Sequence, residues 1–176
     1  VVHSREFNNS MFASLKVKDA IVDYFRQKTG KRPNVDPKNP EIIIQVYINQ
    51  NNCSLSIDSS GESLHKRGYR VKQGKAPLSE VLAAGMILLS GWNGSTDFID
   101  PMCGSGTLPI EAALIAKNVP PGRFRKQYAF MNWNDFDNSL FEKIKTETRF
   151  KEFSKKIYAS DISKQNVLFA EMNARR

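Results

Sequence analysis

The sequence predicts an α/β protein in which a small α/β unit precedes the start of a parallel, doubly wound sheet. Three observations predict this class. A helix-period segment and a hairpin pattern fill the first 60 residues, a glycine loop joins a short strand to a helix, and a second strand–helix pair comes near the end. Strands that alternate with helices favour parallel pairing.

The first unit begins with a helix expected from residue 9 or 10 to about residue 30. Asn9 or Ser10 can cap it, and Gly30 and Pro33 end it. Apolar residues recur at spacings of three and four and predict one buried face, made of Met11, Leu15, Ile21, Tyr24 and Phe25. Two β-patterned segments, 41–48 and 53–58, flank the turn "NQNN" and predict a hairpin.

The second unit alternates helices and strands. We expect a well-buried helix over 77–92, a strand over 97–100, a helix over 108–117, a polar helix over 140–156, a strand over 157–161 and a helix over 163–176. Between them, residues 118–139 are irregular and proline-bearing, and their aromatic residues predict a small cluster.

Composition narrows the class of partner. The net charge of +8 and the pI of about 9.5 favour an anionic partner, nucleic acid first, although a solvated basic surface gives the same charge. The cysteines, Cys53 and Cys103, form no disulfide framework or zinc spacing, which suits a reducing cytoplasm. No apolar run or signal-peptide pattern predicts a membrane association, and the lack of an initial Met suggests a longer parent protein.

The stretch "FIDPMCGSGTLPIEAA", residues 98–113, predicts a cofactor site. Asp100 ends a strand, the two glycines let backbone approach a ligand, and a helix opens with free N–H groups. No Lys follows the last glycine, so a triphosphate would lack its usual countercharge. An acidic residue beside the loop suits a cationic or hydroxyl-rich ligand, and S-adenosylmethionine fits because it carries an ammonium, a sulfonium and a ribose diol.

A second acidic residue, Asp161, ends the second strand. That is where a ribose diol would be bound in a doubly wound sheet. It lies 61 residues after Asp100, against about 20 in the compact dinucleotide motif. Both aspartates could instead be turn and cap residues, since Asp is common at such positions.

Four blocks carry a family resemblance. "DPMCGSGTLPIEAALIA" resembles motif I of the THUMP-domain methyltransferases that modify guanine N2 of 23S ribosomal RNA. "SIDSSGESLHKRGYR" with "APLSEVLAAGMILLSGW" is similar to the family's domain junction, "PPGRFRKQYAFMNWNDFD" to its insertion, and "YASDISKQNVLFAEMNA" to its acidic segment. The opening residues 4–36 are similar to the THUMP helix region. The resemblance implies a THUMP portion at 1–60, a basic linker at 61–75 and the start of a Rossmann-like class I methyltransferase sheet at 76–176.

The resemblance also implies the cofactor residues. S-adenosyl-L-methionine would be lined by Asp100, Pro101, Cys103, Gly104, Ser105, Gly106 and Thr107, with Glu111 facing it from the helix, Asp161 on the ribose and Ile162 beside the adenine. Ala76, Pro77 and Leu78 would pack near the methionine end. A nucleophilic role for Cys103 lacks a neighbouring base, and no metal site is expected.

The sequence departs from the family in one respect. Amino-methylating enzymes use an Asn/Asp-Pro-Pro-Tyr-type loop, and none follows Asp161 in these 176 residues. We therefore assign no catalytic residue and expect this chain to be inactive unaided. The alternatives are a DNA adenine-N6 methyltransferase, which shares motif I, and a non-catalytic RNA-binding module.

Cations and aromatic residues around the expected linker predict RNA contacts. The candidates are Arg5, Asn9, Lys16, Lys18, Lys66, Arg67, Tyr69, Arg70 and Lys72. Tyr69 could stack on a base or pack at a domain interface. With two parallel strands encoded, at 97–100 and 157–160, exposed sheet edges also predict self-association.

Overall fold

The computed structural model describes residues 2–3 and 9–176, which form two compact units. The first unit consists of the described residues up to Gly61 together with Ala129–Phe136, and the second of Glu62–Tyr128 and Asp137–Arg176. Of the expected linker 61–75, residues 62–75 therefore belong to the second unit. Part of the irregular 118–139 segment returns to the first unit, an assignment that sequence patterns did not predict.

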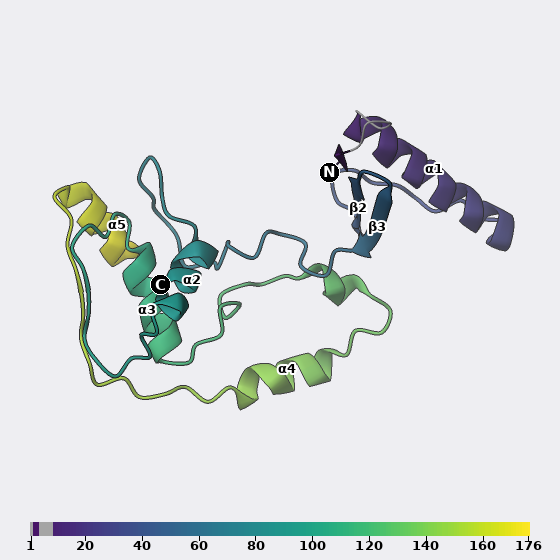
Figure 1. Ribbon diagram of the computed structural model, residues 1–176. Helices are drawn as coiled ribbons and strands as arrows, with labels where there is room; N and C mark the ends of the chain where they lie inside the picture. The colour runs from purple at the N-terminus through teal and green to yellow at the C-terminus, as the bar shows by residue number, and fades with distance from the viewer. Residues whose placement is uncertain (1, 4–8) are drawn as a thin grey trace. The chain divides into compact units, whose positions relative to one another are not determined.

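The long helix of the first unit is confirmed. Helix α1 spans Ser10–Thr29 (Figure 1). The Asn9 side chain accepts a hydrogen bond from Phe12 N at 3.1 Å and so caps the first turn. Gly30 ends the helix with a φ of 70°, and its N–H donates to Arg26 O.

The predicted apolar face of α1 is not its buried face. Only Ala13 and Val22 are buried, whereas Met11 is 72% exposed and Tyr24 is 57% exposed. The described part of the chain places little apolar surface over this helix, so periodicity located the helix but not its packing.

A β-hairpin follows α1, as predicted. Strands β2 (Ile44–Asn49) and β3 (Asn52–Ile57) pair antiparallel, from Ile44 opposite Ile57 to Asn49 opposite Asn52. A short strand, β1 (Val2–His3), adds in parallel to β2 and was not predicted. The 3₁₀ helix η1 (Ala129–Asn132) joins this unit through Phe130 N, which donates to Ser59 O at 3.1 Å.

The second unit contains the predicted parallel strands. Strands β4 (Phe98–Asp100) and β5 (Ile157–Ala159) pair in parallel, with Asp100 opposite Ala159. Helix α3 (Thr107–Ala116) follows β4, and α5 (Lys164–Ala174) follows β5. Both strands therefore end at the same edge of the sheet, which is where ligands bind in open α/β folds.

Two further helices complete the second unit. Helix α4 (Asn138–Glu147) is shorter than the predicted 140–156 helix. Helix α2 (Glu80–Leu89) begins three residues after Pro77, and it is less buried than predicted: Leu89 is 90% exposed. Its buried residues are Glu80, Ala83 and Ile87, since α2 packs on α3 through one face. Among the described helices, none has the length and apolar composition needed to span a membrane.

Gly106 lies where the glycine loop meets α3 and where α5 packs closely against the backbone. It precedes α3 with a φ of 87°, and a Cβ there would lie 2.9 Å from the Cβ of Ala170 on α5. Gly104 has a φ of 54° and no atom within 4 Å of such a Cβ. The two glycines therefore share a left-handed backbone but differ in the space around them.

Gly106→Ala should destabilise the protein by about 2–4 kcal/mol, since backbone strain and a backbone-proximal clash add together. Gly104→Ala should cost about 1 kcal/mol, from strain alone. Thermal unfolding by calorimetry measures both, at roughly 2–4 °C for each kcal/mol. Equal losses in the two variants would show that the approach of α5 does not determine the glycine at 106.

Candidate functional site

Most backbone N–H groups in the loop between β4 and α3 donate hydrogen bonds to acceptors within the protein. Met102 N donates to Asp100 Oδ1 at 3.1 Å, Cys103 N to Ser160 O at 2.8 Å, and Gly104 N to Asp161 Oδ2 at 2.9 Å. A phosphate-binding loop instead points its N–H groups at the ligand. This loop is therefore better suited to a ligand recognised by carboxylates and shape than to a phosphate.

Asp161 holds the loop from the end of the second strand. Besides Gly104 N, its carboxylate accepts hydrogen bonds from Ser163 N at 2.9 Å and from Asn166 Nδ2 at 3.1 Å. These bonds, the one from Ser163 first, lower the pKa of Asp161 below its usual value of 3.8. The carboxylate therefore stays charged at neutral pH, and its stabilising bonds are lost only as the pH falls through that lowered pKa.

A hollow of about 240 Å³ lies beside this loop, within the second unit. Its wall combines the glycine loop with residues 74–78 and one residue of α5, Asn166. Five of the predicted cofactor residues line it, together with the three predicted for the methionine end: Asp100, Cys103, Gly104, Ser105, Thr107, Ala76, Pro77 and Leu78. Gly74, Lys75, Met102, Leu108 and Asn166 also line it and were not predicted.

Other predicted cofactor residues lie outside the wall of this hollow. Asp161 acts through the loop, as described above, and Ile162 beside it is fully exposed. Gly106 lies at the helix junction. Glu111 was expected to face the cofactor, but its side chain is only 2% exposed and turned to other partners.

Cys103 is buried in this loop as a neutral thiol. Burial, followed by the charges of Asp100 and Asp161, raises the pKa of the Cys103 thiol. Reactive cysteines require the opposite, a lowered pKa in a positive environment. The structure therefore supports a packing role for Cys103.

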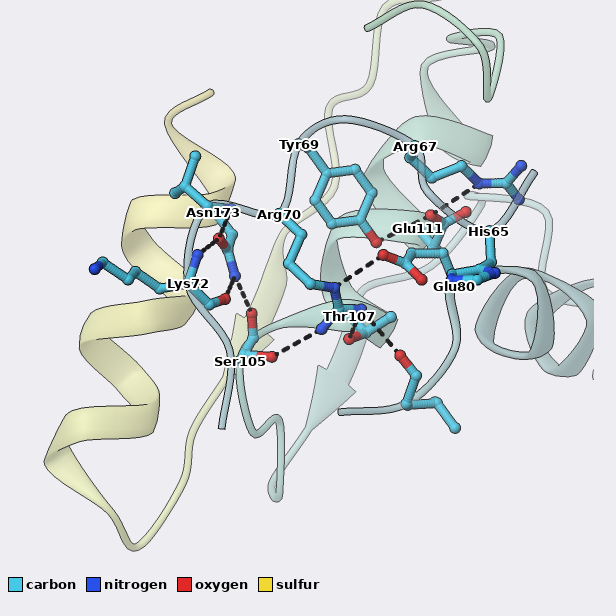
Figure 2. Close-up of polar contacts among 12 residues, drawn as sticks. His65, Arg67, Tyr69, Arg70, Lys72, Glu80, Ser105, Thr107, Glu111 and Asn173 are labelled. Atoms are coloured by element: carbon cyan, nitrogen blue, oxygen red, sulfur yellow. Dashed lines mark hydrogen bonds and ion pairs between the residues drawn. The ribbon is translucent and has the colours of Figure 1, made fainter. Parts of the chain in front are cut away.

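Arg70 links three parts of the second unit (Figure 2). Its Nε donates to Glu80 Oε1 on α2 at 2.9 Å. Its two terminal nitrogens donate to Ser105 Oγ at 3.2 Å, to Thr107 Oγ1 at 3.0 Å and to Leu78 O at 2.9 Å. The fork geometry of a guanidinium allows these contacts at once, so Arg70 ties the glycine loop and the start of α3 to α2.

The neighbouring residues of the chain are held in the same way. Tyr69 is 2% exposed, and its hydroxyl donates to Glu111 Oε1 at 3.0 Å. Arg67 Nε lies 3.5 Å from the same oxygen, as an ion pair. Burial raises the pKa of Glu111, although Arg67 and Tyr69 oppose that shift. Residues Arg67–Lys72 are called the strap below.

Asn173 fastens the other end of the strap. Its Oδ1 accepts from Val71 N at 2.7 Å and from Lys72 N at 3.0 Å, and its Nδ2 donates to Lys72 O at 2.8 Å and to Ser105 O at 2.9 Å. The side chain is 2% exposed, so these four bonds satisfy a fully buried amide. Ser105 is thus held through its hydroxyl by Arg70 and through its carbonyl by Asn173.

The strap changes the interpretation of the predicted RNA contacts. Tyr69 is buried and cannot stack on a base, and Arg67 and Arg70 are paired with buried carboxylates. Their sequence context, cations beside an aromatic ring, matched an RNA surface because their partners lie 10 and 44 residues away along the chain. These three residues stabilise the site instead.

The remaining predicted RNA contacts lie on the surface of their units. Lys66 is exposed and pairs with Glu62, Lys72 is exposed, and Lys16 lies over the Phe12 ring on α1. Lys18 pairs with Asp19, and Asn9 caps α1. Arg5 lies outside the described residues.

Sequence comparison assigns both units. The RMKL-like methyltransferase domain family, UPF0020, matches residues 67–176, and the THUMP domain matches residues 1–58. The first match covers more than half of the chain. The chain therefore belongs to the RMKL-like methyltransferase domain family and carries a THUMP domain before it.

Three solved structures are similar to this chain. SMU.472, a candidate methyltransferase complexed with S-adenosylhomocysteine (SAH), is 34% identical with a TM-score of 0.85 over 99% of this chain and 47% of its own. A candidate methylase from Clostridium difficile 630 is 36% identical, with a TM-score of 0.80 over 90% and 42%. A predicted N6-adenine-specific DNA methylase from Listeria monocytogenes str. 4b F2365 is 34% identical, with a TM-score of 0.78 over 90% and 42%. The chain spans less than half the length of each.

Arg70→Met should lower the free energy of unfolding by about 3–5 kcal/mol, because it leaves the buried Glu80 carboxylate unpaired. The double variant Arg70→Met/Glu80→Gln should recover part of that loss. It should still bind SAH about ten-fold more weakly than the wild type, since the Ser105 and Thr107 hydroxyls lose their hydrogen bonds to Arg70. Calorimetric unfolding and SAH titration separate the two effects. Full recovery of both would limit Arg70 to neutralising Glu80.

Asp161→Asn should weaken SAH binding by about ten- to hundred-fold, because the amide cannot replace a charged acceptor of backbone N–H groups. Asp137→Asn is the matched control. Asp137 caps α4 by accepting from Ser139 N and Leu140 N, and it lies outside the hollow's wall. Titration calorimetry of both variants with SAH measures the difference, and equal affinities would exclude a role for Asp161 in the cofactor site.

Proposed function

We propose that the chain is the THUMP and cofactor-binding part of an S-adenosylmethionine-dependent methyltransferase that methylates an exocyclic amine of ribosomal RNA, with guanine N2 of 23S ribosomal RNA as the preferred target. The observation that carries this proposal is the glycine loop, whose N–H groups mostly bond within the protein, one of them to Asp161. The loop lies beside a hollow that Asp100 lines. The family match and the SAH bound in SMU.472 support the choice of cofactor.

The hollow has the chemistry that S-adenosylmethionine requires. Asp100 and Lys75 both line it, which suits the ammonium and carboxylate of a methionine group. Asp161 accepts three hydrogen bonds, and a carboxylate has about four acceptor positions, so capacity remains for a ribose hydroxyl. The exposed Ile162 beside it offers an apolar contact for the adenine. When bound, the cofactor would supply the methyl group.

The choice of RNA rests on the first unit. A THUMP domain precedes the methyltransferase domain, and the chain is basic overall. Two further proposals follow from the same reasoning: the protein processes ribosomal RNA in the cytoplasm, and its cysteines remain reduced there. Cys53 and Cys103 are both free thiols in the structure. Self-association through the outer edges of β4 and β5 remains a prediction, and a stable monomer in light scattering would contradict it.

One comparison favours a second candidate. The Listeria monocytogenes relative is predicted to methylate adenine N6 of DNA. Adenine N6 and guanine N2 are both exocyclic amines, so a similar cofactor site serves either reaction. The THUMP match over residues 1–58 supports RNA as the substrate of this chain. A non-catalytic RNA-binding module would bind RNA without transferring a methyl group.

Methyl transfer from tritiated S-adenosylmethionine tests these alternatives in the full-length protein. Label should enter unmodified 23S ribosomal RNA and not duplex DNA, and nucleoside mass spectrometry should find N2-methylguanosine. Transfer to DNA, detected as N6-methyl-2′-deoxyadenosine, would support the second candidate. RNA binding without transfer would support the binding module. The 176-residue chain alone should show no transfer.

A further inference from the structure

The basic excess of this chain is concentrated in two short segments of the second unit. Residues 117–126 contain four cations and no acidic residue, and residues 149–156 contain four cations and one acidic residue. Their combined charge is +7, whereas the whole chain carries +8. The RNA contacts predicted around the strap lie outside these two segments, and several of them pair with carboxylates. They therefore do not account for the basic excess.

The fold brings these two segments together. Lys151 N donates to Lys117 O at 2.9 Å, and Asn118 Nδ2 donates to Arg149 O at 3.0 Å. Between them lies an open hollow of about 690 Å³, here called the basic hollow, lined by Lys117, Arg123, Phe124, Phe150, Lys151, Glu152 and Phe153, among others. Bringing like charges together costs energy unless an anion neutralises them.

The cations of the basic hollow have no acidic partners. Among the described residues, no carboxylate lies within 4 Å of the charged nitrogens of Lys117, Arg123 or Lys151, and all three residues are exposed. On α4 the situation differs, because Lys143 pairs with Glu147 and Lys145 with Glu142. The cations of the basic hollow therefore differ from those of α4 in lacking an ion pair within the described part of the chain.

Aromatic rings lie among these cations. Phe150 is 53% exposed, and the Arg123 guanidinium lies over its ring, 5.6 Å from the centroid. Phe124 is 37% exposed, whereas Phe153 is half-buried and packs edge-on against Trp92. Exposed rings within a cationic groove are the features with which proteins bind unpaired nucleotides, stacking the bases and neutralising the phosphates.

We propose that the basic hollow binds a single-stranded segment of the RNA substrate, with Arg123, Lys117 and Lys151 on its phosphates and Phe150 against a base. This inference rests on the proposed RNA substrate and adds a binding site within the methyltransferase unit. The hollow begins where α3 ends, and the cofactor loop lies where α3 begins. A ten-residue helix is about 15 Å long, so the hollow holds RNA at a distance from the methylated base.

The test compares two double variants of the full-length protein that remove the same charge from the same unit. Arg123→Gln/Lys151→Gln changes the hollow, and Lys143→Gln/Lys145→Gln changes α4. Affinity for a fluorescein-labelled single-stranded RNA of about 20 nucleotides is measured by anisotropy at several salt concentrations, and SAH binding is measured by calorimetry. The hollow variant should lose roughly ten-fold in RNA affinity near 0.15 M salt and show a shallower salt dependence, by about 1–2 in log–log slope.

The α4 variant should keep RNA affinity within about two-fold, and both variants should bind SAH as the wild type does. Phe150→Leu should weaken binding of the single strand by about ten-fold, with a smaller effect on duplex RNA, whose bases are not available for stacking. Equal losses in the two double variants would replace the proposed site with diffuse charge, and no loss in either would remove it. SAH binding without any RNA binding by the wild type would overturn both the RNA assignment and this site. RNA binding that depends on the hollow, without SAH binding, would support the site and contradict the proposed cofactor.

Discussion

The second unit depends on one buried ion pair, between Arg70 and Glu80. Removing two charges from water is costly, and the remaining guanidinium hydrogen bonds offset that cost only in a fixed geometry. Here those bonds go to Ser105, Thr107 and Leu78 O, which belong to the glycine loop, the start of α3 and the segment before α2. The hydrogen bonds that satisfy the buried Arg70 guanidinium therefore also fix the conformation of the glycine loop. That conformation in turn depends on the Arg70–Glu80 ion pair.

The same constraint explains the polar interior of this unit. Its buried residues include Glu80, Asp100, Ser105, Glu111 and Asn173, a set more typical of a functional site than of an apolar core. The strap supplies partners for most of them. The strap residues 67–72 lie close to the start of the second unit at Glu62, so the first part of this unit along the chain contacts the glycine loop.

Much of the fold could be predicted from local patterns. Helix α1 was predicted from its cap at Asn9 and its end at Gly30, and the hairpin from the alternation of its strands. The glycine loop predicted the positions of β4 and α3. Strand β1 was missed because two residues carry no periodicity. The exposure of Leu89 was missed because a uniformly apolar helix does not reveal which face finds a partner.

The candidate site could be predicted where a local strand–loop–helix pattern places its residues. It could not be predicted where side chains bond to partners far away along the chain. Asp100, Gly104 and the aspartate at 161 follow from the strand–loop–helix pattern. Tyr69 and Arg70 resembled an RNA surface because sequence shows cations but not the carboxylates that neutralise them. Arg123 and Lys151 were not predicted as a site because they lie 28 residues apart, and only the fold places their segments together.

The return of Ala129–Phe136 to the first unit has a consequence for synthesis on the ribosome. The bond from Phe130 N to Ser59 O joins residues 71 positions apart. At a synthesis rate of about 5–20 residues per second, residues 129–136 are made several seconds after the rest of the first unit. By then most of β4 and α3 have already been synthesised. The two units therefore cannot mature strictly one after the other, and a contact of this sequence separation slows folding, because the intervening loop must close first.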